Sequence, residues 1–257
     1  MLGMSPYGLT LAFAIFVAYL FTAVRAKGRG LSAEIVWDSL PWVLFFGIAG
    51  ARAYHVLNYW SYYSHNFLLI PQVWLGGLGI LGGLGGGLLG LLIYFFKFKK
   101  DPSLRTAQDD GGGLFRISNY LDAAAPAIIL GQALGRVGNI LNRENLPYAW
   151  WEIILDIFIF LLLLFFEQIK NKQTGKRIFN FQFSIFNKFR NVSMFKLYLF
   201  LYCLGRFGLE FLRHDSPWIL GPLSVAQWVC LGVIIGILFK ALFIRAMATL
   251  RFWIWLH

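Results

Sequence analysis

The sequence predicts an all-α membrane protein with about seven transmembrane helices. Hydrophobic residues make up 58% of the 257 residues and charged residues only 14%, and the mean hydropathy is +0.64. A soluble domain has roughly half apolar and about a quarter charged residues, so this composition excludes an ordinary soluble protein. The apolar residues also gather in runs close to the roughly 20 residues that a helix needs to cross a bilayer.

Seven apolar segments fit this interpretation, and little chain lies outside them. We therefore expect residues 1–257 to form one integral-membrane domain. In chain order the predicted spans are Leu9–Val24, Ile35–Leu57, Leu75–Phe96, Leu121–Leu141, Trp150–Phe166, Phe195–Leu212 and Leu223–Ile244.

The third span is unusual because residues 76–90 contain nine glycines. They form two stripes with a four-residue spacing, which is typical of helices that pack closely in lipid. The alternative is a thin helix that leaves room for lipid chains or a headgroup. The stripes are Gly79/Gly83/Gly87 and Gly82/Gly86/Gly90.

Positive charge predicts the orientation of the chain. Of the 23 Lys and Arg residues, 18 fall in four clusters that occupy alternate loops and the C-terminal tail. The positive-inside rule places these clusters in the cytoplasm, the N-terminus outside and the C-terminus inside. The net charge of +11 therefore indicates contact with anionic membrane lipid rather than with nucleic acid. The clusters lie at residues 25–29, 97–116, 170–196 (a basic cytoplasmic loop) and 240–251.

The five remaining basic residues are all arginines at the predicted outer ends of spans. If positive charge served only to orient the chain in the membrane, the outer ends of the spans would carry none. Arginine is the residue that recognises phosphate or carboxylate through two parallel hydrogen bonds. The sequence thus predicts an anion site at the outer membrane face, drawn from Arg52, Arg136, Arg143, Arg206 and Arg213.

One polar run closes the fourth span, from Gly135 to Glu144. A charge near the bilayer centre costs about 3 kcal/mol, so such residues are functional candidates. In a helix, Arg136, Asn139 and Arg143 share one face, because they are spaced i, i+3 and i+7. Their donors suit a phosphodiester. The alternative is a cluster that only anchors the helix at the interface.

A second charged face is predicted at the end of the sixth span. Arg206, Glu210 and Arg213 are spaced i, i+4 and i+7. Glu210, between two arginines, is either an ion-pair partner or a base, and we favour the ion pair. Cys203 and Cys230 are expected to be packing thiols, and no residues have the spacing of a metal site.

The run Gly135 to Glu144 is similar to the signature Gly-Arg-x-Gly-Asn-Phe-x-Asn-x-Glu of the prolipoprotein diacylglyceryl transferase family, with Ile140 in place of Phe. Weaker matches follow the order of the family's elements and cover nearly the whole chain. They are Tyr7-Gly8, Gly50 to Leu57, Asp122 to Pro126, Glu152 to Asp156, Arg206 to Arg213, and Ser224 to Gln227.

The resemblance implies a transferase of the bacterial inner membrane that acts in lipoprotein maturation without a cofactor. It would move the diacylglyceryl group of phosphatidylglycerol to the lipobox cysteine in the signal peptide of a prolipoprotein. Arg136 and Arg206 would bind the phosphate and stabilise the leaving group, and Glu144 would orient Arg136 or relay a proton. The headgroup would also contact Gly138, Asn139, Asn142, Tyr7, Arg52, Glu210 and Arg213.

The chain departs from the family at two places. Leu81 stands where many members carry a histidine proposed as catalytic, and a leucine cannot accept a proton. Only a few residues separate Glu144 from Trp150, where many members insert an outer arm. The alternative interpretation is therefore a non-enzymatic or decayed phospholipid-binding or transport protein that uses the same arginines.

Overall fold

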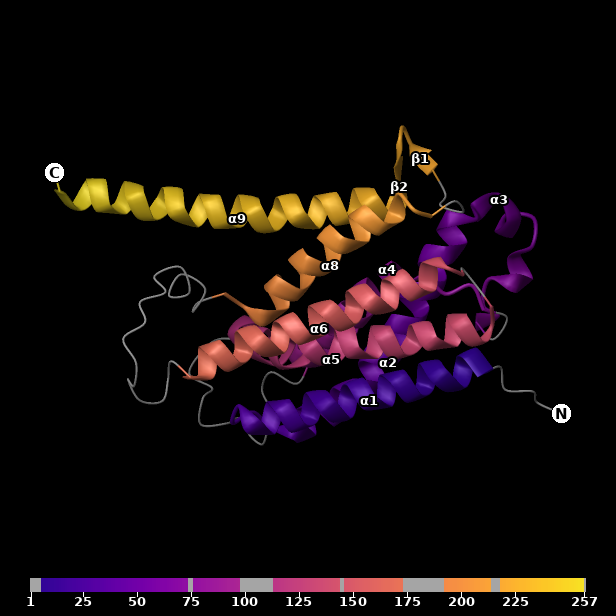
Figure 1. Cartoon of the computed structure of the whole chain (residues 1–257), viewed down its shortest axis with the longest axis horizontal. Helices are drawn as coiled ribbons and strands as arrows, with labels where there is room; N and C mark the ends of the chain where they lie inside the picture. Colours follow the sequence, from indigo (N-terminus) through magenta and orange to yellow (C-terminus); the bar gives the residue numbers. More distant parts are fainter. Residues whose placement is uncertain are drawn as a thin grey trace. The chain divides into compact units, whose positions relative to one another are not determined.

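The computed structural model describes residues 6–73, 76–97, 113–143, 146–172, 192–213 and 218–256, and these are mostly helical (Figure 1). The predicted all-α class is confirmed. The helices are α1 (Pro6–Gly28), α2 (Ala33–Asn58), α3 (Trp60–Tyr63), η1 (Phe67–Leu69), α4 (Ile80–Lys97), α5 (Gly113–Leu141), α6 (Tyr148–Lys172), α8 (Met194–Glu210) and α9 (Val225–Leu256). A short antiparallel pair, β1 (Trp218–Leu220) and β2 (Leu223–Ser224), joins α8 to α9.

Every predicted span overlaps one of these helices. Five of them, α1, α2, α4, α5 and α6, are long and apolar enough to cross a membrane. α8 has 17 residues, and α9 is counted only over the shorter apolar stretch Val225–Lys240. A multi-pass membrane protein is thus confirmed, while seven spans and the orientation of the termini stay predictions.

The helices divide into two compact units. One unit contains residues 16–127, and the other contains residues 1–15 and 128–257. The expectation of a single domain stays a prediction.

In the unit formed by residues 16–127, the glycine stripes bring α4 against α2. A Cβ atom added at Gly82, Gly86 or Gly90 would collide with α2 backbone, at Gly50, Phe46 and Trp42 respectively. Added Cβ atoms at Gly83 and Gly87 would meet only ordinary contacts, at 3.6 and 3.4 Å. An added Cβ atom at Gly79 would collide with the ring of Tyr54. The packing interpretation of the stripes is therefore supported, and Gly82/Gly86/Gly90 is the stripe that meets α2 backbone at all three positions.

The same unit has an apolar core where the chain passes from α1 to α2. Ala26, Ile35 and Tyr94 are buried together there. Arg25 Nε donates to the carbonyl of Ala123 at 2.8 Å. The side chain of Ser32 caps the start of α2 by accepting the N–H of Glu34.

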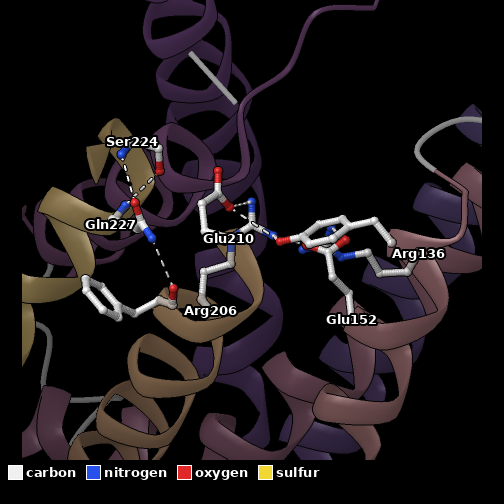
Figure 2. Close-up of polar contacts among 8 residues, drawn as sticks. Arg136, Glu152, Arg206, Glu210, Ser224 and Gln227 are labelled. Carbon is white, nitrogen blue, oxygen red and sulfur yellow. Dashed lines mark hydrogen bonds and ion pairs between the residues drawn. The ribbon is translucent and has the colours of Figure 1, made fainter. Parts of the chain in front are cut away.

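In the other unit, a reciprocal cap begins α9. Ser224 Oγ accepts the N–H of Gln227 at 3.2 Å, and Gln227 Oε1 accepts the N–H of Ser224 at 2.9 Å, which is a capping box. The amide nitrogen of the fully buried Gln227 donates to the carbonyl of Phe207 at 3.3 Å and so links α9 to α8 (Figure 2).

Candidate functional site

The ends of three helices bring charged side chains together in the unit that contains residues 128–257. Arg136 lies near the end of α5, Tyr148 and Glu152 lie in the first turns of α6, and Arg206 lies near the end of α8. Since α5 and α8 end where α6 begins, residues far apart in sequence meet here, as Figure 2 shows. Acidic and basic groups inside such apolar helices are expected to pair.

Glu152 joins the two arginines. Its Oε2 accepts from Arg136 Nη1 and its Oε1 accepts from Arg206 Nη1, so one carboxylate serves two guanidinium groups from two helices. The residue is 2% exposed. Charges held in this way are screened little by solvent.

Arg206 has two further partners. Its Nη1 donates to Tyr148 Oη at 2.7 Å, and its Nη2 lies 3.0 Å from Glu210 Oε2. The Tyr148 hydroxyl in turn donates to Glu210 Oε2 at 3.4 Å. The predicted i, i+4 pairing of Arg206 with Glu210 is confirmed, and the ion-pair interpretation of Glu210 is supported.

Arg213 follows the end of α8 and joins the same cluster. Its guanidinium carbon lies 5.7 Å from the centroid of the Tyr148 ring, and that of Arg206 lies 5.5 Å from it. The Nε atom of Arg213 is buried and makes no hydrogen bond within the described part of the chain. Tyr148 therefore contacts both arginines of the α8 end.

We call these six residues the arginine cluster: Arg136, Tyr148, Glu152, Arg206, Glu210 and Arg213. Three guanidinium groups against two carboxylates leave one formal positive charge. Such a cluster complements an anion with one negative charge, and a phosphodiester is one. Buried arginines also stabilise charge that develops on a leaving oxygen.

The signature residues lie around the end of α5. Gly138 is buried, Asn139 is partly buried, and Asn142 is exposed. The expected shared face does not extend to Arg143, because α5 ends at Leu141 and Arg143 has a left-handed φ of +54° in the following turn. The Asn142 N–H donates to the carbonyl of Gly138 at 3.0 Å.

Two predicted site residues are not placed. Glu144 lies outside the described residues, and Tyr7 belongs to the first turn of α1 but its side chain is outside the described part. Neither prediction is therefore tested.

Arg52 belongs to the other unit and organises the loop before α4. Its Nε donates to the carbonyl of Ile70 at 2.8 Å, and its Nη1 donates to the carbonyls of Gly76 at 2.7 Å and Gly77 at 3.3 Å. Its Nη2 donates to the carbonyl of Leu69. Its guanidinium also lies 5.1 Å from the Tyr63 ring centroid. All three nitrogens of the guanidinium thus bind backbone, and a contact with a ligand stays a prediction.

Sequence reasoning did not include Glu152 and Tyr148 among the site residues. The sequence could have indicated Glu152, because it is an acid at the start of an otherwise apolar span and it matched a family element. Nothing in the sequence indicated Tyr148, because an aromatic residue at the end of a span is common. Within the described residues no cluster of three metal-ligating side chains occurs.

Comparison with known proteins gives a consistent picture. Residues 1–243 match the family model described as "Prolipoprotein diacylglyceryl transferase". Three relatives carry the name phosphatidylglycerol--prolipoprotein diacylglyceryl transferase. The one from Prochlorococcus marinus (strain MIT 9301) is 31% identical over 92% of this chain and 88% of its own length. Those from Trichormus variabilis and Finegoldia magna are each 32% identical over 90% of this chain, and over 82% and 87% of their own lengths.

Proposed function

Because the chain belongs to the prolipoprotein diacylglyceryl transferase family, we propose that it transfers the diacylglyceryl group of phosphatidylglycerol to a prolipoprotein. The acceptor is the thiol of the lipobox cysteine in the signal peptide. The observation that supports this most strongly is the meeting of Arg136 and Arg206, from separate helices, on one buried carboxylate.

The reaction is a displacement at a saturated carbon. The cysteine sulfur forms a bond to the carbon of the diacylglyceryl group that carries the phosphate. The bond from this carbon to the phosphate oxygen breaks, glycerol 1-phosphate leaves with the electron pair, and the thiol releases its proton. Negative charge grows on the departing phosphate. Fixed guanidinium groups in a site with little water stabilise this charge, and each lowers the barrier by about as much as one hydrogen-bond donor to an oxyanion does, about 3 kcal/mol.

Within this proposal, Arg136 and Arg206 bind the phosphate. Asn139, Asn142 and Gly138 fix the headgroup, and Glu144 orients Arg136 or relays a proton. The further candidates for contact with the lipid are Tyr7, Arg52, Glu210 and Arg213.

Leu81 leaves the proton acceptor unassigned. The residue is a partly buried leucine in α4, so the chain has no imidazole at this position. Guanidinium groups near the incoming thiol favour its thiolate form, because positive charge lowers the pKa of a thiol. The arginine cluster thus favours formation of the thiolate, which a dedicated base would otherwise have to produce.

The family acts in bacterial lipoprotein maturation, and the basic loops favour an inner-membrane protein with seven spans, the N-terminus outside and the C-terminus in the cytoplasm.

The test is direct transfer by purified protein. We expect incubation with phosphatidylglycerol and a peptide that contains a lipobox cysteine to add one diacylglyceryl mass to that cysteine. A cysteine-to-serine peptide is the control and should gain no mass. Binding of phosphatidylglycerol without any mass gain would instead identify a phospholipid-binding protein and contradict the transferase.

A further inference from the structure

We infer that Glu152 is a positioning residue that holds Arg136 and Arg206 at the spacing that stabilises the departing phosphate. This inference rests on the proposed function and adds a residue that the signature does not contain. It starts from an arrangement in which the two oxygens of one carboxylate are divided between two guanidinium groups.

Two arginines from separate helices that meet in one place bring like charges together. Like charges repel, and the repulsion is strong where water is scarce, since it scales inversely with the dielectric constant. The side chains of Arg136 and Arg206 are 12% and 7% exposed, so solvent screens them poorly. A shared anion between them replaces repulsion by two attractions.

The position of Glu152 in the fold suits this role. The residue lies in the second turn of α6, whereas its partners lie on α5 and α8, so it ties three helices at one point (Figure 2). Its own side chain is 3% exposed and is therefore held in place. Glu210 pairs with Arg206 of its own helix and accepts from Tyr148 of α6, whereas Glu152 pairs with arginines of two other helices.

Glu152 also sets the net charge of the arginine cluster. With Glu152 the cluster has a formal charge of +1, and without it the formal charge would be +2. A cluster of higher positive charge still attracts a phosphodiester, so binding of the lipid does not depend on Glu152. Loss of Glu152 instead leaves the two guanidinium groups free to move apart, which weakens stabilisation of the transition state.

Asp156 provides a matched comparison on the same helix. It lies one turn after Glu152 and is 1% exposed. Its Oδ2 makes no hydrogen bond within the described part of the molecule. A change of Asp156 to Asn also removes a buried acid whose charge acts on Arg136 and Arg206, but within the described residues it breaks no ion pair with either arginine.

The experiment measures kcat and KM for phosphatidylglycerol in detergent or nanodiscs, with a fixed excess of lipobox peptide. For Glu152→Gln we expect kcat to fall at least tenfold and KM for phosphatidylglycerol not to rise. Glu152→Asp keeps the charge but is one methylene shorter and cannot serve both arginines equally. Its kcat should lie between the wild-type value and that of Glu152→Gln. Asp156→Asn should keep kcat within threefold of wild type.

Three results would overturn the inference. Glu152→Gln could keep the wild-type kcat, it could change KM without changing kcat, or Asp156→Asn could lose as much kcat as Glu152→Gln. Should Glu152→Gln fail to fold, as judged by gel filtration and its melting temperature, Glu152→Asp decides the question, since a wild-type kcat in that variant would contradict positioning. No transfer by the wild-type protein would refute the proposed function itself, which separates the two failures.

Discussion

At the scale of single residues, the arrangement explains why arginine rather than lysine occupies position 206. Its guanidinium contacts the carboxylates of Glu152 and Glu210 and the hydroxyl of Tyr148. A planar group with five fixed donors makes three such contacts in one geometry, whereas an ammonium group is a point charge on a flexible stem. A lysine would keep the charge and lose the fixed geometry.

The same reasoning gives a prediction for the signature arginine. Arg136→Ala should reduce transfer at least a hundredfold, because it removes one of two guanidinium groups and leaves Glu152 with one partner. The variant should still insert into the membrane, as measured by its yield in the membrane fraction. The measurement is the mass gain on the lipobox peptide.

Leu81→Ala is the matched control for that experiment. It removes a side chain at the position where family members carry histidine, but no proton chemistry is possible at a leucine. Transfer should stay within a fewfold of wild type. Wild-type transfer by Arg136→Ala, or abolished transfer by folded Leu81→Ala, would contradict this assignment.

Much of this site could be predicted from the sequence. Arg136, Arg206, Glu210 and Arg213 were predicted because charged residues in apolar spans are rare, and the structure brings them together. Tyr148 and Glu152 were not among the predicted site residues, because pairing between helices depends on tertiary packing. Arg143 was wrongly assigned to the helical face, because the i, i+7 spacing was extended past Leu141, where both the predicted span and α5 end and a turn with left-handed φ follows.

At the scale of elements, close packing of α4 on α2 depends on the stripe Gly82/Gly86/Gly90. The backbone of α2 lies where a side chain at these positions would start. Helices that approach this closely gain van der Waals contacts that larger residues would prevent.

This packing predicts a difference between two adjacent glycines of α4. Gly86→Ala should destabilise the protein by about 1–3 kcal/mol, because the added Cβ collides with the carbonyl of Phe46. Gly85→Ala is the control, because within the described residues nothing outside its own turn of helix lies within 4 Å of its added Cβ. Alanine also favours a helix by up to about 1 kcal/mol over glycine. Melting temperatures in detergent should fall for the first variant and stay level or rise for the second. Equal effects would contradict the packing.

Helix positions were well predicted from hydropathy, since each of the seven apolar segments overlaps a helix. Their ends were less well predicted. For example, the predicted third span begins at Leu75 but α4 begins at Ile80. The pair β1–β2 and the short α3 were not predicted, because elements of two to four residues are too short to show a period.

At the scale of the whole molecule, the distribution of charge predicts the topology. Lys and Arg residues are concentrated in alternate loops, and the sequence between α2 and α4 contains neither. The positive-inside rule then places residues 59–79 outside and residues 98–112 in the cytoplasm.

Labelling of introduced cysteines tests this orientation. The native Cys203 and Cys230 are both buried, so they should react little. A membrane-impermeant maleimide should label His65→Cys in intact cells, since His65 is exposed in the loop before α4. Ser103→Cys should be labelled only after the cells are permeabilised. The reverse pattern would contradict the predicted topology.

The central claim is that guanidinium groups from α5 and α8 form one site for the phosphate of an anionic lipid. Native mass spectrometry of the detergent-solubilised protein tests it most directly, with equal amounts of phosphatidylglycerol and zwitterionic phosphatidylcholine. We expect the wild-type protein to retain phosphatidylglycerol preferentially, and the folded double variant Arg136→Gln/Arg206→Gln to lose at least tenfold of that preference. Unchanged preference in the double variant would contradict the account.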